Sequence, residues 1–325
     1  MAEVLAGIYA HTAGVEPVSN QEKGTQVSSG DFGRSFSSLL TKDNVNSFTG
    51  LPSLEVLNAL VSCYGKIVRI TNKHPLSARE RVVLTMMKLK HNVSTTFLKN
   101  LFRCSLSTCT RIIFETTRVL SQILRSVVCI PSKEVILENM PVHFRPFQNV
   151  RLVLDCTEMA IAQPKCFRSA LLTYSFYKKG FTCKYMISVT PSGVIAHISK
   201  GYGGRASDKA IFEQSGVLES LLPVVDAIMI DRGFLIDSFC EDRLITVIRP
   251  PLRQQVQLPK QQALQTQKIA SARVHVQRAI QRMKIFKILA SRIPWSLLGI
   301  MDDIMLVIEG VTNLSASLFA EERFI

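Results

Sequence analysis

The stretch VRLVLDCTEM (150–159) is a run of branched apolar residues that leads into an acid, Asp155. Such a run is typical of a buried strand. VDAIMIDRGFL (225–235) has the same form, and its acid is Asp231. Because burying a lone carboxylate is costly, an acid at the carboxyl end of a buried strand indicates a functional position and not a packing position. Asp155 and Asp231 are therefore the first candidate site residues.

Two acids of this kind indicate a bound cation. Open α/β sheets place ligand sites at the carboxyl ends of their strands, and two carboxylates on neighbouring strands repel each other unless a cation lies between them. Because carboxylate oxygens suit Mg²⁺ or Mn²⁺, we expect Asp155 and Asp231 to bind a divalent metal. The alternative is that each aspartate caps the turn after it or pairs with an arginine.

Further strands surround these two runs. CKYMISVTPSGVIAHISKGY (183–202) predicts two strands joined by a Pro-Ser-Gly turn, and RLITVIRPP (243–251) predicts another strand. A meander of strands followed by strands that alternate with helices predicts an α/β domain over 151–318, with a mixed sheet flanked by helices.

Three helices are expected in the same domain. SDKAIFEQSGVLESLL (207–222) would begin at Ser207 or Asp208 as its cap. RVHVQRAIQRMKIFKIL (273–289) has apolar residues at helical spacing and no acid. The third is the apolar stretch WSLLGIMDDIMLVIEGVTNL (295–314).

The first part of the chain has helical periodicity that divides into three helices. Ser77 would cap the first, with Glu80 completing a capping box. Ser94 would cap a short second helix, and Ser107 a third that runs to about Leu124. A short helix, a tight turn and a longer helix form the helix-turn-helix pattern.

This helical region, placed at 47–128, is basic. Residues 61–125 hold 12 Lys and Arg against 2 Asp and Glu, whereas residues 1–60 hold 3 against 6. Concentrated positive charge favours a polyanion-binding face, although a plain helical bundle with a solvated basic surface would have the same composition. The residues expected to contact DNA are Lys99, Arg103, Thr108, Arg111 and Arg118.

Composition gives the remaining limits. Residues 1–46 are rich in Ser, Gly, Thr and Asn and are expected to be mostly disordered, and residues 129–150 are expected to form a connector with one short helix. Eight cysteines without a C-x-x-C pair predict reduced intracellular thiols. Neither a signal peptide nor a membrane-spanning run is expected.

Several motifs in order resemble a known family. LVLDCTE (152–158), the long segment 173–219, IDRGFLID (230–237) and the two C-terminal helices resemble the DDE superfamily endonuclease domain of Harbinger-like and related eukaryotic transposases. LSARERVVLTMMKLKHNVSTTFLKNLF (76–102) resembles the helix-turn-helix that often precedes it.

The resemblance implies an RNase H-like fold in which three carboxylates hold two metal ions. The first two match Asp155 and Asp231. The third is a glutamate in a helix whose pattern reads R-x-H-V-E-R, and here that position is Gln277. We therefore expect strand cleavage to be impaired. The other acids weighed as replacements are Glu158, Asp208, Asp302, Asp303 and Glu309.

Other implications concern partners. DNA is the expected ligand, and the residues near the site expected to follow its backbone are Lys178, Lys179, Arg273 and Arg278. We also expect a nuclear location, with the cytoplasm as the alternative. Two further expected partners are a separate DNA-binding protein and a second copy of the chain in a homodimer. Three functions remain as alternatives: an active nuclease, a non-enzymatic descendant that binds DNA or protein, and a phosphohydrolase that acts on small substrates. The basic helices disfavour the phosphohydrolase.

Overall fold

The structure is a computed structural model that describes residues 35–70, 75–251 and 260–315. From Ser35 onward these residues pack as one compact unit. The expected disorder of residues 1–34 lies outside the described residues. Residues 35–46, in contrast, are folded: Phe36 and Leu40 are buried, and α2 begins at Val45. Their apolar side chains pack on the helices that follow, which composition did not reveal.

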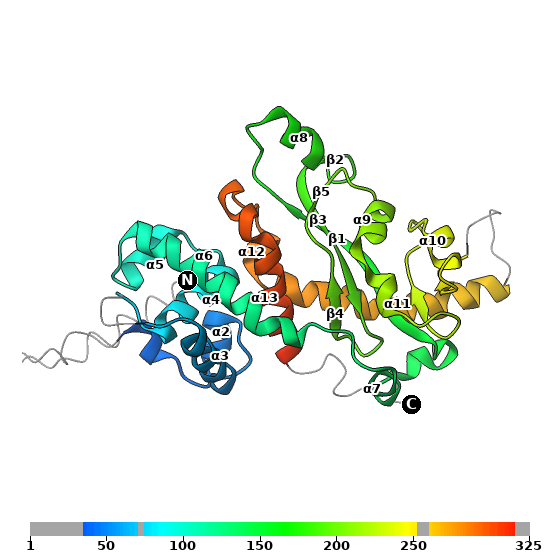
Figure 1. The fold of residues 1–325 in the computed structure, drawn as a ribbon, viewed down its shortest axis with the longest axis horizontal. Coiled ribbons are helices and arrows are strands. Elements are labelled where there is room, and N and C mark those ends of the chain that lie inside the picture. Colours follow the sequence, from blue (N-terminus) through cyan, green and yellow to red (C-terminus); the bar gives the residue numbers. More distant parts are fainter. Residues whose placement is uncertain (1–34, 71–74, 252–259, 316–325) are drawn as a thin grey trace, which may run out of the picture. The chain divides into compact units, whose positions relative to one another are not determined.

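The first part of the chain is helical. Its elements are 3₁₀ helix η1 (Phe36–Leu39), α2 (Val45–Thr49), α3 (Leu54–Ile67), α4 (Ala78–His91), α5 (Thr95–Leu101), α6 (Leu106–Leu124), η2 (Arg125–Val127), α7 (Lys133–Glu138) and η3 (Val142–Phe147). Figure 1 shows their succession.

The three helices predicted as a helix-turn-helix are α4, α5 and α6. The predicted capping box of Ser77 and Glu80 opens α4, and Ser94 caps α5. The prediction that Ser107 caps the third helix is wrong. Ser105 caps α6 by accepting a hydrogen bond from the Thr108 amide at 3.1 Å, because the chain turns two residues earlier than predicted and Leu106 already has helical geometry.

The second part of the chain forms a sheet with helices. Its elements are β1 (Val150–Ala160), α8 (Phe167–Thr173), β2 (Tyr174–Ser175), β3 (Gly180–Val189), β4 (Ile195–Ile198), β5 (Tyr202–Gly203), α9 (Asp208–Ser215), η4 (Val217–Ser220), β6 (Ala227–Met229), α10 (Asp237–Glu241), β7 (Thr246–Ile248), α11 (Lys260–Lys284), α12 (Lys287–Ala290), η5 (Trp295–Ile300) and α13 (Met301–Leu314). As predicted, Ser207 caps α9.

The sheet is mixed, with the order β2-β3-β1-β6-β7 and with β4 and β5 paired to β3. Strand β1 pairs antiparallel with β3 and parallel with β6, which pairs parallel with β7. The predicted mixed sheet flanked by helices is therefore confirmed. The predicted hairpin is present as β3 and β4, and Gly193 in its turn has a φ of 86°, a conformation that favours glycine.

Alternate residues of β1 contribute to two different cores. Val153 and Met159 pack with the apolar side of α11 and with α13, whereas Leu152 and Leu154 pack with α9 and α10. The helices thus form one layer on each face of the sheet (Figure 1). Side chains of a strand alternate between faces, so from Leu152 onward each position of β1 has its neighbours fixed by whether its number is odd or even; Val150 lies before an irregularity in the register and belongs to the first core.

The helical region and the sheet share the first of these cores. Helix α6 packs against α13, and α4 against α12. A Cβ at Gly310 would lie 2.7 Å from the Cβ of Leu124, so the absence of a side chain there lets α13 approach α6 closely. The Ser121 hydroxyl also donates a hydrogen bond to Asp303 at 2.5 Å. These contacts fix the helix-turn-helix against the sheet domain.

Helix α13 buries a carboxyl group in this core. Glu309 is fully buried, and neither of its carboxylate oxygens has a hydrogen-bond partner among the residues that the structure describes. Burial raises its pKa well above the ordinary glutamate value. Burial therefore favours the neutral acid, because an unpaired buried charge would cost more.

This group should make stability depend on pH. The folded protein retains the Glu309 proton at pH values where the unfolded chain has lost it, so the free energy of unfolding should fall as pH rises above the ordinary glutamate pKa. We expect Glu309→Met to raise that free energy by about 1–3 kcal/mol at neutral pH, since an unsatisfied polar group is removed.

Denaturant unfolding of the parent and two variants at pH 5 and pH 8 provides the test. Glu309→Gln removes the ionisation but keeps a polar group, so it should lose the pH dependence and gain less stability than Glu309→Met. A parent whose stability relative to Glu309→Gln does not change between these pH values would contradict the assignment.

Candidate functional site

The register of β1 and β6 brings the two aspartates together. Val153 pairs with Met229 in the parallel ladder, and Asp155 and Asp231 each lie two residues beyond that pair. Parallel strands run in the same direction, so both residues follow the end of the shared ladder on neighbouring segments. Asp155 is not at the end of its strand as predicted, because β1 continues to Ala160 through its pairing with β3. The edge is formed by the end of β6.

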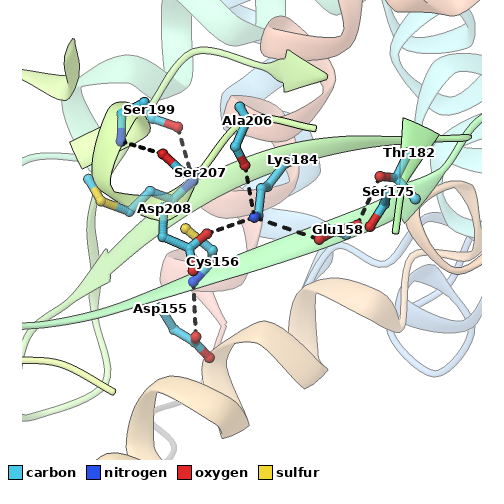
Figure 2. A network of polar contacts seen from close by, with 12 residues as sticks. Asp155, Cys156, Glu158, Ser175, Thr182, Lys184, Ser199, Ala206, Ser207 and Asp208 are labelled. Carbon is cyan, nitrogen blue, oxygen red and sulfur yellow. Dashed lines mark hydrogen bonds and ion pairs between the residues drawn. The ribbon is translucent and has the colours of Figure 1, made fainter. Parts of the chain in front are cut away.

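Asp155 points to the α11 side of the sheet. It shares a face of β1 with Val153 and Met159, which pack against that side, and Figure 2 shows its carboxylate turned away from Lys184. Its Oδ1 accepts a hydrogen bond from the Cys156 amide at 2.9 Å. Burial raises the pKa of Asp155; the Arg273 guanidinium opposes this rise, and the nearby Asp231 carboxylate adds to it. The two aspartates are thus electrostatically coupled.

Asp231 is more exposed and is held by an arginine. Its Oδ1 accepts hydrogen bonds from the Arg232 amide and from Arg273 Nη1, both at 2.8 Å. The Asp231 side chain is 54% exposed, whereas that of Arg273 is 11% exposed. The sequence left open, as the alternative to a bound metal, that each aspartate caps the turn after it or pairs with an arginine. Asp231 does both. Arg273, predicted as a DNA contact, is paired with Asp231 in the structure and lowers the pKa of Asp155, and its contact with DNA stays a prediction.

Gln277 lies on α11 four residues after Arg273, so the two residues share one side of the helix. Gln277 is exposed. The helix that lies beside the aspartates therefore brings them a guanidinium, followed one turn later by an uncharged amide. Within the described residues, no group of three or more His, Cys, Asp or Glu is placed to hold a metal ion.

Glu158 and Asp208 lie on the opposite face of β1 from Asp155. Lys184 on β3 is directly across from Glu158 in the ladder, and its Nζ lies 3.7 Å from Glu158 and 2.7 Å from Asp208 (Figure 2). Glu158 also accepts a hydrogen bond from the Thr182 hydroxyl at 2.9 Å. Burial alone would lower the pKa of Lys184, but the hydrogen bond to Asp208 and the nearby negative charges raise it. Both acids are engaged by this lysine.

The acids of α13 are also engaged elsewhere. Asp302 accepts hydrogen bonds from the Tyr185 hydroxyl at 2.7 Å and the Gly201 amide at 3.0 Å. Asp303 accepts from Ser121, and Glu309 is enclosed in the core. Asp302 thus links α13 to β3 and Asp303 links it to α6, whereas Glu309 makes no such link.

The residues predicted to contact DNA are mostly at the surface of the helical region. Arg103, Arg111 and Arg118 are exposed, and Lys99 is half-buried on α5. Arg111 lies 3.7 Å from Glu115 on the same helix. Thr108 is half-buried, and its Oγ1 accepts a hydrogen bond from Ser105, so it belongs in part to the cap of α6.

Near the sheet, Lys178, Lys179 and Arg278 are exposed. The rings beside these lysines were not among the predicted site residues, although the turn FYKK (176–179) lacks the residues that usually form turns. Lys284 was not among the predicted site residues either. In the structure Lys284 lies within electrostatic range of Asp155 and Lys178, a neighbourhood that spacing in the chain could not reveal.

Comparison with known proteins agrees with this architecture. Residues 154–313 match the family described as DDE superfamily endonuclease, and residues 74–126 match the helix-turn-helix of DDE superfamily endonuclease. The two matches occur in the expected order, and the second covers α4 to α6. The chain therefore belongs to the DDE superfamily endonucleases, with an RNase H-like sheet domain that follows a helix-turn-helix. A search of curated proteins found no match.

No described helix is long and apolar enough to cross a membrane.

The role of Arg273 can be tested through the titration of Asp155. Because the guanidinium lowers the pKa of this carboxyl, we expect Arg273→Gln to raise it further. Carboxyl ¹³C chemical shifts followed against pH provide the measurement. Lys268→Gln removes a positive charge from an exposed position on the same helix and should leave the Asp155 titration unchanged. An equal effect of the two variants would argue against a specific role for Arg273.

Proposed function

We propose that this protein binds DNA through the DDE endonuclease fold and that its capacity to cleave strands is impaired. The observation that carries the proposal is the chemistry of α11, which lies beside Asp155 and Asp231. Arg273 donates a hydrogen bond to Asp231 at 2.8 Å, and Gln277 one turn later is an amide. In the family pattern a carboxylate would stand at position 277.

The residues present do not fit a pair of metal ions. Two-metal hydrolysis of a phosphodiester needs anionic ligands that hold two dications about 3.5–4 Å apart, and the divalent metal used generally by DDE endonucleases supplies that chemistry. Two aspartates beside a guanidinium carry a net charge of about −1. Asp155 and Asp231 could hold one dication if Arg273 released Asp231, but an amide oxygen without charge is a poor third ligand.

The helical region supports DNA binding. Arg103, Arg111 and Arg118 are exposed on or beside the second and third helices of a helix-turn-helix. In this motif the start of the third helix meets the major groove and flanking basic residues contact phosphates. Contacts between α6 and α13 join this region to the sheet domain, so one duplex could lie along both. A nuclear location and assembly with a further subunit are parts of the same proposal.

Position 277 gives the sharpest test of impairment. We expect the parent to bind at most one Mg²⁺ or Mn²⁺ weakly in a calorimetric titration, and Asp155→Ala to bind none. Gln277→Glu should raise the affinity by about 10-fold or more, since even ligand-supporting residues contribute about 10–100-fold. The same variant should increase nicking of supercoiled plasmid.

Gln281→Glu adds a carboxylate one turn further along α11 and serves as the matched control. If Gln277→Glu bound metal no better than the parent or than this control, the assignment of position 277 would be wrong. A parent that nicked plasmid efficiently with two bound ions would refute the proposed impairment.

DNA binding can be tested separately from metal. Arg118→Gln should weaken binding of duplex DNA and reduce the slope of log affinity against log salt by about 0.9, the value for one lost phosphate contact. Arg243→Gln removes an exposed arginine at the amino end of β7 and should leave both quantities unchanged. Fluorescence anisotropy at several salt concentrations measures them. Equal behaviour of the two variants would exclude Arg118 from the interface.

A further inference from the structure

The turn between β2 and β3 exposes two aromatic rings and two lysines. This aromatic tip consists of Phe176, Tyr177, Lys178 and Lys179. The hairpin is closed by the pair Tyr174–Phe181, and the Lys178 amide donates a hydrogen bond to the Ser175 hydroxyl at 3.2 Å. Phe176 is 74% exposed and Tyr177 is 83% exposed. Their rings contribute little to the core, so folding does not explain their presence.

The rings belong to an ordered cluster. Tyr174 makes edge-to-face contacts with Phe176 and with Phe181, at centroid distances of 5.5 and 5.6 Å. The Lys178 ammonium lies 4.8 Å from the centroid of the Tyr177 ring. The tip therefore presents flat apolar surfaces next to positive charge, the combination that binds the bases and phosphates of an unpaired strand.

A cavity lies directly beside the tip. Its volume is about 520 Å³, within the roughly 300–1,000 Å³ typical of small-ligand sites. Its walls include the rings of Tyr174 and Phe181 and the cations of Lys178, Lys179 and Arg292. The single carboxylate among the lining residues, Glu158, is already bonded to Thr182 and paired with Lys184. The cavity is therefore suited to an anionic ligand with a flat ring.

The tip is connected to the aspartate edge. Strand β3 begins where β1 ends, so the tip lies beyond the carboxyl end of β1, whose final residue Ala160 is about 17 Å along the strand from Asp155. Between them, burial lowers the pKa of Lys284 on α11, the nearby Lys178 lowers it further, and Asp155 opposes that change. Lys284 also lines a small cavity together with Thr157 and Met159, on the part of β1 between Asp155 and the tip.

We propose that the aromatic tip and its cavity bind unpaired nucleotides at the end of a DNA duplex that lies along the Asp155–Asp231 edge. Phe176 and Tyr177 stack on bases, while Lys178, Lys179 and Arg292 contact phosphates. This inference rests on the proposed DNA binding and adds the form of DNA that is preferred. A protein partner would also cover exposed rings, but the interleaved cations and the basic cavity favour a nucleic-acid strand.

Anisotropy with the full chain in the absence of divalent metal tests this preference. The probes are a blunt fluorescein-labelled duplex and two versions extended by about six unpaired nucleotides, one at the 3′ end and one at the 5′ end, a length that spans the distance from the aspartates to the tip. We expect the parent to bind one extended probe more tightly than the blunt probe by roughly 5- to 150-fold, the range for one stacked base.

Substitutions then locate the effect. Phe176→Ala/Tyr177→Ala should remove the preference and leave blunt-duplex affinity unchanged, whereas Phe176→Tyr/Tyr177→Trp should keep it. The matched control is Leu222→Ala/Leu244→Ala, two exposed apolar residues at the amino ends of β6 and β7; it should behave as the parent. Fluorescence of 2-aminopurine in the extension should be quenched on binding to the parent and not to the alanine pair.

The possible failures are distinguishable. A parent that binds blunt and extended duplexes equally, or an alanine pair that keeps the preference and the quenching, would overturn this inference and leave DNA binding intact; the exposed rings would then point to a protein partner. A parent that binds none of the probes would overturn the proposed function together with this inference. Melting temperatures confirm that each variant is folded.

Discussion

The parallel pairing of β1 with β6 is the constraint from which the site follows. The ladder ends at Val153 and Met229, and the two aspartates lie at the same distance beyond it. Because β6 stops there while β1 continues along β3, Asp155 has an exposed flank in the middle of a long strand. An unpaired stretch beside a buried strand is where polar side chains can reach both a ligand and water. The fold thus concentrates two negative charges at one place, and some positive charge must compensate them.

Alternation along β1 decides which charges meet. Asp155 faces α11 and Arg273, while Glu158, three residues later, faces Lys184 and Asp208 on the other side of the sheet. Neither acid can therefore substitute for a ligand on the opposite face without breaking the strand register. The same separation explains how a polar network and a candidate site coexist within four residues of one strand. The negative charge is compensated in part and separately on each face, by Arg273 on one and Lys184 on the other.

The helix-turn-helix is part of the same core as the sheet domain. Helices α6 and α13 approach closely at Gly310 and are joined by the bond from Ser121 to Asp303. Asp303 therefore stabilises this junction, Asp302 is held by Tyr185 and Gly201, and neither acid is available to the Asp155–Asp231 edge.

The sequence alone predicted the main helices and strands and identified Asp155 and Asp231 as the two acids of the candidate site. Periodicity within a short segment reveals the apolar runs that lead to Asp155 and Asp231. Local hydrogen bonding explains the cap residues, such as Ser77, Ser94 and Ser207. The amide at Gln277 is read directly from the sequence. Tertiary structure decided everything that depends on distant partners. The length of β1 comes from its pairing with β3. Asp231 is paired with Arg273, which lies forty-two residues away in the sequence. The pKa of Glu309 is raised because helices pack around it. These could not be predicted because burial and charge proximity are set by chain segments that only the folded packing brings together.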